Sequence, residues 1–449
     1  MRLRKLALSA AGSMALIGAM PAAQAIDMEA GDWTFSVNGN VNANYVYSSC
    51  DTGAPISFGG ALAGGVVGAC NINGPIDDDV SSVRTGLLPA ALVFTAATQQ
   101  NGWDISGTFG LYPGIVTNED GGVGPGGSPN LSPGNNVALG STSLDIRQVF
   151  LKFGNADFGT VKAGRDFGLF GYDAIINDMT IPAVGVGTLA VGSPGNTTLG
   201  SIGFGYIYTD TLSQINYTTP DMGGFTATAG VFQTIDSLSS PSTVGVGESL
   251  PGFHGQLRYE WDGAFVSLNA VTLEVDGVND VDTDGDGAVD DQSVDDERVY
   301  GVDLNYKQNL GAIDFLISGY YTEGLGSVAY LFDAFDAAGN KRDSYGGLAQ
   351  VTFTAGKNKF GLNYGISYLD TTDFDEASFP TATDDDGNAI CPNGDVCLFE
   401  SNQKVTAGYY YSLTPNLTLT AEYSYAESEN HAGDQYDANN VNVGAFFAF

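Results

Sequence analysis

Positively charged residues are scarce in this sequence. Of its 449 residues, 16 are Lys or Arg and 52 are Asp or Glu, and charged residues make up 15% of the whole. Proteins that bind nucleic acid contact phosphates through clustered Lys and Arg, so we expect no nucleic-acid partner. The acidic excess favours two compatible roles: enrichment of cations near the openings of the molecule, and solvation of its exposed segments.

Long apolar runs are also missing. After residue 25, no stretch of about eighteen or more apolar residues occurs, which argues against a membrane-spanning helix. Residues 1–25 combine a basic start, a short apolar stretch and the cleavage site Ala23-Gln24-Ala25, which predicts a secretory signal peptide. Residues 26–449 are then a single domain whose 13 basic and 52 acidic residues leave a charge of −39. An exported chain of this kind is either a soluble secreted protein or a transmembrane barrel.

Histidine is nearly absent, and this bears on catalysis. The two histidines are His254 and His431, and neither belongs to a visible set of nucleophile, histidine and carboxylate. The sequence also lacks a glycine-rich phosphate-binding loop. We therefore predict that the protein is not an enzyme and requires no cofactor.

Cysteine occurs four times, as two local pairs. The pairs are Cys50 with Cys70 and Cys391 with Cys397, each in a segment that we interpret as an external loop. Neither spacing is CxxC and no histidine lies near a cysteine, which argues against a zinc site. In an exported protein the pattern predicts two loop disulfides, Cys50–Cys70 and Cys391–Cys397.

Glycine and aromatic residues, in contrast, are abundant, with 62 Gly, 25 Phe and 22 Tyr. Short segments alternate between apolar residues and small or polar ones, for example over 225–231, 360–368 and 417–425. Such alternation predicts strands with one face toward an apolar environment and the other toward a wet interior. Aromatic residues near the strand ends are typical of the girdles at the two interfaces of a transmembrane barrel.

The predicted connections alternate between short and long. The short turns are Gln99–Gly102, Asn155–Asp157, Pro220–Gly224, Asp262-Gly263, Asn309–Gly311, Gly356–Asn358 and Thr414–Asn416. The long loops lie near 50–80, 114–143, 167–211, 234–252, 276–296, 323–343, 371–401 and 427–437. These connections predict an all-β fold, a transmembrane antiparallel barrel of sixteen strands, which is large enough for an aqueous channel. Closure requires the last strand to pair with the first, near residues 33–48.

The C-terminal segment carries a further pattern. It resembles the signal by which the outer-membrane assembly machinery recognises its clients, and the matching residues are Asn442, Gly444, Phe447 and Phe449. The alternation predicts that Asn440, Asn442 and Gly444 face the interior, and that Val441, Val443, Phe447 and Phe449 face lipid.

Two motifs carry a resemblance to a known family. Residues 147–165 read RQVFLKFGNADFGTVKAGR and are similar to a hairpin of the Gram-negative general diffusion porins; residues 215–225, INYTTPDMGGF, resemble the family's next hairpin. The resemblance implies an outer-membrane barrel in lipid, assembled as a homotrimer. It also implies that the third long loop, 167–211, folds into the pore; a long loop without structure of its own is often functional.

The resemblance further implies a charged pore constriction. Basic residues on the wall would oppose acids on the loop and create a transverse field across a narrow wet passage. The matching positions are Arg84, Arg147 and Arg165 on the wall and Asp173 and Asp178 on the loop. The chain departs from the family pattern at Asn40, near Ala183 and near Thr209-Asp210, so a less charged constriction is expected.

An acidic stretch resembles a calcium-binding loop, in which alternate carboxylates converge on one cation and Gly285 permits the bend. The candidate ligands are Asp280, Asp282, Asp284, Asp286, Asp290 and Asp291. The alternative is a flexible acidic loop that binds divalent cations weakly, because the ligand pattern is imperfect.

Together these features predict an outer-membrane porin for passive diffusion of small hydrophilic solutes and ions, with a modest preference for cations. Two alternatives stay open at this point. One is a substrate-specific channel of the same fold, and the other is a secreted calcium-binding β-protein or adhesin.

Overall fold

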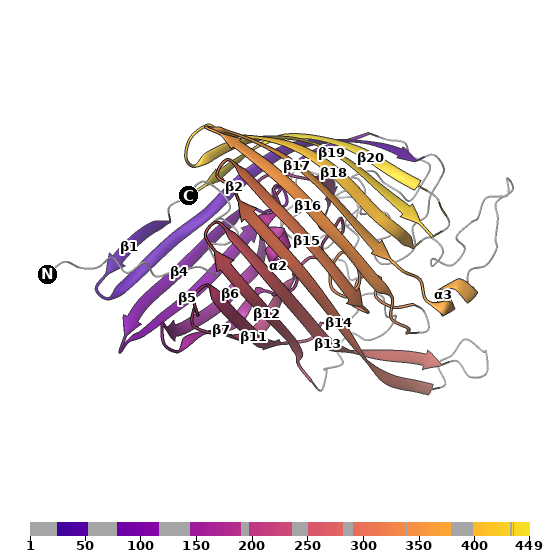
Figure 1. Ribbon diagram of the computed structural model, residues 1–449, viewed down its shortest axis with the longest axis horizontal. Coiled ribbons are helices and arrows are strands. Elements are labelled where there is room, and N and C mark those ends of the chain that lie inside the picture. The colour runs from indigo at the N-terminus through magenta and orange to yellow at the C-terminus, as the bar shows by residue number, and fades with distance from the viewer. Residues whose placement is uncertain are drawn as a thin grey trace.

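The computed structural model describes residues 25–52, 79–115, 144–189, 197–235, 250–281, 291–336, 339–378, 398–431, 433 and 435–449. Antiparallel strands run side by side in chain order and close into a barrel (Figure 1). Among the described residues, no helix is long and apolar enough to span a membrane.

The barrel sheet contains eighteen strands. In chain order they are β1 (Ile26–Ala30), β2 (Trp33–Thr52), β3 (Val80–Arg84), β4 (Ala91–Gln100), β5 (Trp103–Pro113), β6 (Leu144–Asn155), β7 (Gly159–Phe167), β10 (Thr211–Thr218), β11 (Phe225–Phe232), β12 (Gly252–Trp261), β13 (Ala264–Val281), β14 (Asp291–Asn309), β15 (Ile313–Glu323), β16 (Asp343–Ala355), β17 (Asn358–Leu369), β18 (Phe399–Ser412), β19 (Leu417–Asn430) and β20 (Gln435–Ala448). A short helix, α3 (Asp373–Ser378), follows β17.

These eighteen segments fill sixteen positions in the wall. Both β3 and β4 pair with β2, so they are two parts of one interrupted strand. The short β1 pairs with Trp33–Val37 of β2 and continues the line of β20, which pairs with β2 from Asn40 onward. The predicted count and the predicted closing pair are therefore confirmed. Strand β1 was not predicted, because its five residues, IDMEA, show no clear alternation.

The wall has two chemically different faces. On β20, Val441 and Val443 are 46% and 52% exposed on the outside, whereas Asn440 and Asn442 are 0% and 1% exposed on the inside. Adjacent side chains of a strand point to opposite faces, so this difference repeats with a period of two residues. The predicted orientation of the final strand is confirmed at these positions.

The short turns join strands at one end of the barrel, and the strand ends that flank the longer connections lie at the other, as predicted. Each of the seven predicted turns is present to within a residue or two. Asn101 and Gly102 both have positive φ, at 51° and 81°, which is the backbone that a two-residue hairpin turn requires.

One predicted loop is largely wrong. Residues 276–296 are for the most part strand, because β13 and β14 stay paired as far as Val281 and Asp291. The acidic composition of this stretch is typical of a loop. Two antiparallel strands, however, can stay paired beyond the rim of the barrel through their backbone hydrogen bonds alone, whatever side chains they carry.

Several predicted side-chain features fall outside the described part of the chain. These are the cysteine pairs, since Cys70, Cys391 and Cys397 lie outside it and the side chain of Cys50 is not described. The same holds for most of the acidic stretch, Asp282–Asp290, which separates the ends of β13 and β14. Among the described residues, no three His, Cys, Asp or Glu side chains are grouped to hold a metal ion.

His431 lies just beyond β19, at the long-loop end of the barrel. Its Nε2 lies 2.8 Å from the carbonyl oxygen of Leu369, and its backbone N–H donates to that of Leu398. Burial lowers the pKa of this imidazole below 6.5, against the opposing effect of the hydrogen bond to Leu369. In this contact the imidazole of His431 is therefore neutral. If the contact opens, the imidazole takes up a proton as the pH falls below 6.5, so acid favours the opened state.

We expect acidification from pH 7.5 to 5 to loosen this contact. Amide hydrogen exchange near residues 369 and 398, corrected for the intrinsic pH dependence, should become faster. The variant His431→Gln should lose that pH dependence. An identical response in the variant and the parent would contradict the assignment.

Candidate functional site

The segment 168–210, between β7 and β10, is held by side chains from the inner face of the wall. It contains helix α2 (Tyr172–Asn177) and two short strands, β8 (Val186–Leu189) and β9 (Thr198–Gly200). The chain enters α2 through Gly171, whose φ of 76° favours glycine and whose added Cβ would lie 2.3 Å from the carbonyl oxygen of Ile207. The N–H of Gly171 donates to Asp303 of β14 over 2.8 Å, which fixes the start of the helix to the wall.

Asp173 in α2 makes the most extensive ionic contact of this segment. Its carboxylate accepts hydrogen bonds from Arg258 at 2.7 Å, Ser267 at 2.6 Å and Gln256 at 3.1 Å. Asp173 is 2% exposed, and charge-assisted bonds of this kind are the stronger hydrogen bonds in proteins. Arg258 is shared with Glu260, which lies 2.5 Å from its Nε. The helix is thus bound to β12 and β13.

Asp178, at the end of α2, is a structural acceptor inside the segment. One oxygen accepts from the backbone N–H and the hydroxyl of Thr180, both at 2.9 Å. The other accepts from the Tyr206 hydroxyl at 2.8 Å, and burial together with this carboxylate raises the pKa of Tyr206 far above its ordinary value. Asp178 therefore joins the two halves of the segment, and Asn363 of β17 approaches it at 3.4 Å.

Further wall side chains fix the backbone of the segment. Gln350 of β16 accepts from the N–H of Met179, and Glu422 of β19 accepts from the N–H groups of Val184 and Gly185. Other contacts of the same kind are Lys307 with the side chain of Asn177, Lys404 with the carbonyl of Gly200, and Ser367 with the N–H of Gly205. Backbone groups that a strand or helix would pair are here satisfied by side chains from distant strands.

Apolar contacts accompany these polar ones. Phe204 and Ile202 of the segment share a buried cluster with Leu316 of β15 and Leu348 of β16. Phe204 is completely buried, and burial of such a side chain contributes about 1.5–3 kcal/mol. The segment therefore has an apolar core of its own against the wall, which was not predicted from the sequence.

The three predicted arginines lie in different surroundings. Arg84 on β3 is buried and donates to the carbonyl of Gly187, so it contacts the segment 168–210. Arg147 on β6 forms an ion pair with Asp145 at 2.6 Å and lies over the ring of Tyr112.

Arg165 lies on the other face of the wall. It is exposed and directly opposite Val149, an outward-facing residue, and cross-strand partners share a face. Its guanidinium donates to Thr211 at 2.8 Å. The structure thus places Arg165 away from the pore position that was predicted for it.

The arginine that binds Asp173 was not among the predicted site residues. Arg258 alternates with the outward-facing Leu257 and Tyr259, so its parity marks it as an inward residue. The same parity identifies Lys307 and Glu422. This signal is present in the sequence, but it does not say which inward residues meet the segment.

The C-terminal residues contribute to closure of the barrel. Gly444 lies opposite Asn44, and an added Cβ would come 1.9 Å from the Asn44 side-chain oxygen. Asn442 donates to Glu422, whereas Phe447 is exposed on the outer face. The backbone of Phe449 exchanges two hydrogen bonds with Gly39, at 2.8 and 3.0 Å.

A closed antiparallel barrel with an apolar outer face and a polar inner face defines a transmembrane β-barrel of the outer membrane. The chain belongs to the Gram-negative porin family, whose model matches residues 7–431. It is thus an outer-membrane porin channel and not an enzyme. Family membership overturns the alternative of a secreted calcium-binding protein.

Solved structures show the same fold. The outer membrane channel DcaP of Acinetobacter baumannii aligns with a TM-score of 0.60 at 14% identity, over 94% of this chain and 99% of that one. Salmonella typhi OmpF aligns with a TM-score of 0.53 at 13% identity, over 94% and 100%. Pseudomonas putida OprB aligns with a TM-score of 0.53 at 11% identity, over 92% and 94%. No curated protein sequence matches.

Proposed function

We propose that this porin mediates passive diffusion of small hydrophilic solutes and ions, and that the segment 168–210 lies within the barrel and narrows the passage. The observation that carries the proposal is the binding of this segment by inward-facing side chains of strands from β12 to β19. Figure 1 is consistent with it, since α2 is drawn among the strands of the barrel. A segment tethered on several strands sets a fixed cross-section without any energy-coupled step.

In this proposal the predicted acids act mainly as tethers. Asp173 and Asp178 hold the segment in place, while Arg84 and the ion pair of Arg147 with Asp145 place charged groups on β3 and β6. The resulting field orients dipolar solutes in a narrow passage. We further propose assembly by the outer-membrane machinery into a homotrimer; the support is the family resemblance.

We propose a modest preference for cations. Acidic residues outnumber basic ones by 52 to 16 in the whole chain. An acidic mouth raises the local concentration of cations. Basic residues nearer the short turns, such as Lys307 and Lys359, keep the preference modest.

Reversal potentials measured across a planar bilayer in a KCl gradient test the preference. The expected result is a reversal potential whose sign indicates that K⁺ permeates more readily than Cl⁻. Its magnitude should fall at high salt, because screening shortens the range over which the charges act. A potential of the opposite sign would contradict the proposal.

A further inference from the structure

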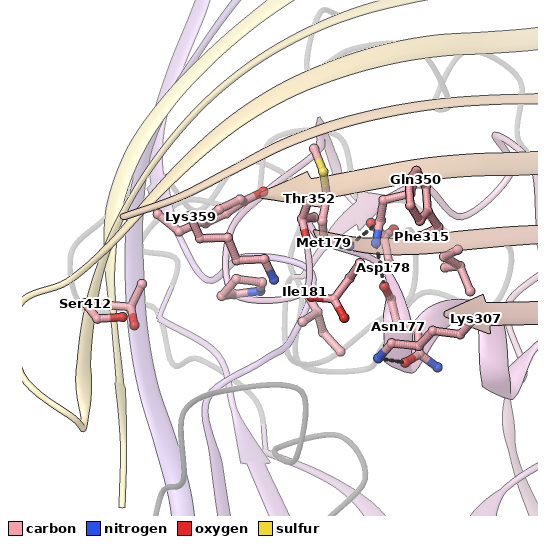
Figure 2. A pocket seen from close by; sticks show the side chains of 15 residues that line it. Asn177, Asp178, Met179, Ile181, Lys307, Phe315, Gln350, Thr352, Lys359 and Ser412 are labelled. Atoms are coloured by element: carbon pink, nitrogen blue, oxygen red, sulfur yellow. Dashed lines mark hydrogen bonds between the residues drawn. The ribbon is translucent and has the colours of Figure 1, made fainter. Parts of the chain in front are cut away.

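A cavity of about 250 Å³ lies between the segment 168–210 and the end of the barrel with the short turns. In an outer-membrane barrel that end faces the periplasm. Figure 2 shows the lining side chains, which come from the segment on one side and from wall strands β14 to β19 on the other. An engineered cavity of about 150 Å³ accepts benzene, so this space accommodates a ring-sized solute with a polar group.

Two ammonium groups enter this cavity. Lys307 of β14 uses one donor on the side-chain oxygen of Asn177, at 2.7 Å, and the ammonium group has two further donors. Lys359 of β17 lies with its Nζ 5.8 Å from the centre of the Tyr410 ring. Within the described part of the chain, no carboxylate lies within ion-pair distance of either lysine.

A buried hydroxyl group provides an independent indication of a ligand. Thr352 of β16 lines the cavity and is 2% exposed, yet its Oγ1 has no hydrogen-bond partner among the described residues. An unsatisfied buried polar group costs about 1–3 kcal/mol, so a solute that supplies a partner would be favoured there.

The other lining groups define the chemistry of the solute. Met179, Ile181 and Leu316 form an apolar side of the cavity. Two acids also line it: Asp178, which accepts from the donors described above, and Asp314, which accepts from the side chain of Asn309 at 2.5 Å and whose charge acts on both lysines without an ion pair to either. The cavity thus offers cationic donors on one side and an apolar surface on the other.

We infer that this cavity is a binding site for small monocarboxylates with an apolar body, such as an aromatic or short aliphatic acid. The carboxylate is bound by Lys359 and Lys307, one oxygen accepts from Thr352, and the apolar body lies against Met179 and Ile181. The inference rests on the proposed channel function and assigns it a solute class. Because the site lies on the periplasmic side of the segment, access from that side is the shorter route.

The test is single-channel recording in KCl with benzoate, its neutral analogue benzamide and the cation benzylammonium. Benzoate should interrupt the current in a saturable manner, more readily from the periplasmic side, whereas the other two should not. Lys359→Gln and Lys307→Gln should each weaken the block by roughly tenfold or more, since a charge-assisted hydrogen bond is lost. Thr352→Val should weaken it less, and Lys359→Arg should retain it.

Lys357→Gln is the matched control, because Lys357 lies two residues from Lys359 and donates to the carbonyl of Leu413 at the exposed turn. Heat-modifiable migration on gels confirms that each variant is folded, and calorimetry with benzoate in detergent measures binding without current. A channel that conducts KCl but is not blocked by benzoate, or is blocked equally in the Lys359 and Lys307 variants, overturns the site alone. A folded protein that conducts no ions overturns the channel function itself.

Discussion

Replacing Asp173 with alanine is expected to increase the single-channel conductance and to make it fluctuate. The substitution removes the acceptor of Arg258, Ser267 and Gln256, and so releases α2 from β12 and β13. Breaking a buried ion pair costs about 3–5 kcal/mol, and the lower end applies because Arg258 keeps Glu260 as a partner. Asp303 and Gln350 still hold the segment, so we expect local release without loss of the barrel.

Planar-bilayer recordings and amide hydrogen exchange over residues 171–189 measure this effect together. Asp157→Ala, at an exposed short turn, is a matched control that removes the same charge outside the segment. Asp173→Asn should be intermediate, because an amide oxygen still accepts a hydrogen bond but carries no charge. If conductance and exchange in Asp173→Ala equal those of the parent, Asp173 does not hold the segment 168–210 in the passage proposed above.

Deleting Phe449 is expected to remove most of the folded protein from the outer membrane. The backbone of Phe449 pairs with Gly39, at the junction where β20 ends and the line is continued by β1. Its ring also lies 5.8 Å from that of Phe447, centre to centre. The deletion thus removes two hydrogen bonds of the closing seam and one aromatic residue of the proposed assembly signal.

The molecules that still assemble should conduct normally, since the backbone hydrogen bonds and the ring contact of Phe449 are with Gly39 and Phe447 rather than with the segment 168–210. Phe449→Leu separates the two contributions, because it keeps both backbone hydrogen bonds and removes only the ring. The measurement is the amount of heat-modifiable barrel in the outer-membrane fraction. Assembly of the deletion variant at the level of the parent would contradict the role of this residue.

Much of the wall was predictable from the sequence because its determinants are local. Alternation with a period of two sets the face of each side chain, as at Val441 and Asn442. The hairpin turns are also determined locally. At Asn101-Gly102, for example, the turn depends on the positive φ of two adjacent residues. Closure between β20 and β2 then follows from the need to leave no unpaired edge in a membrane.

The site was predictable only in part. The motif that resembles the porins pointed to Asp173 and Asp178, whose carboxylates hold the segment after β7; their place in a pore constriction stays a prediction. It did not identify Arg258, which lies 85 residues from Asp173 in the sequence. Strand alternation indicates that Arg258 faces inward, but about half of all wall residues do so. Alternation does not show which of these inward residues contact the segment 168–210.

By itself, therefore, the sequence determined that this protein forms a barrel with an apolar outside and a polar inside, in which neighbouring strands pair in order. Only the tertiary structure decided which inward side chains meet the segment 168–210, and hence where the cavity with Lys307 and Lys359 lies. The physical reason is that strand alternation depends on adjacent residues. Contacts between distant strands and the segment 168–210 depend instead on the curvature of the whole barrel and on how this long segment packs against the wall.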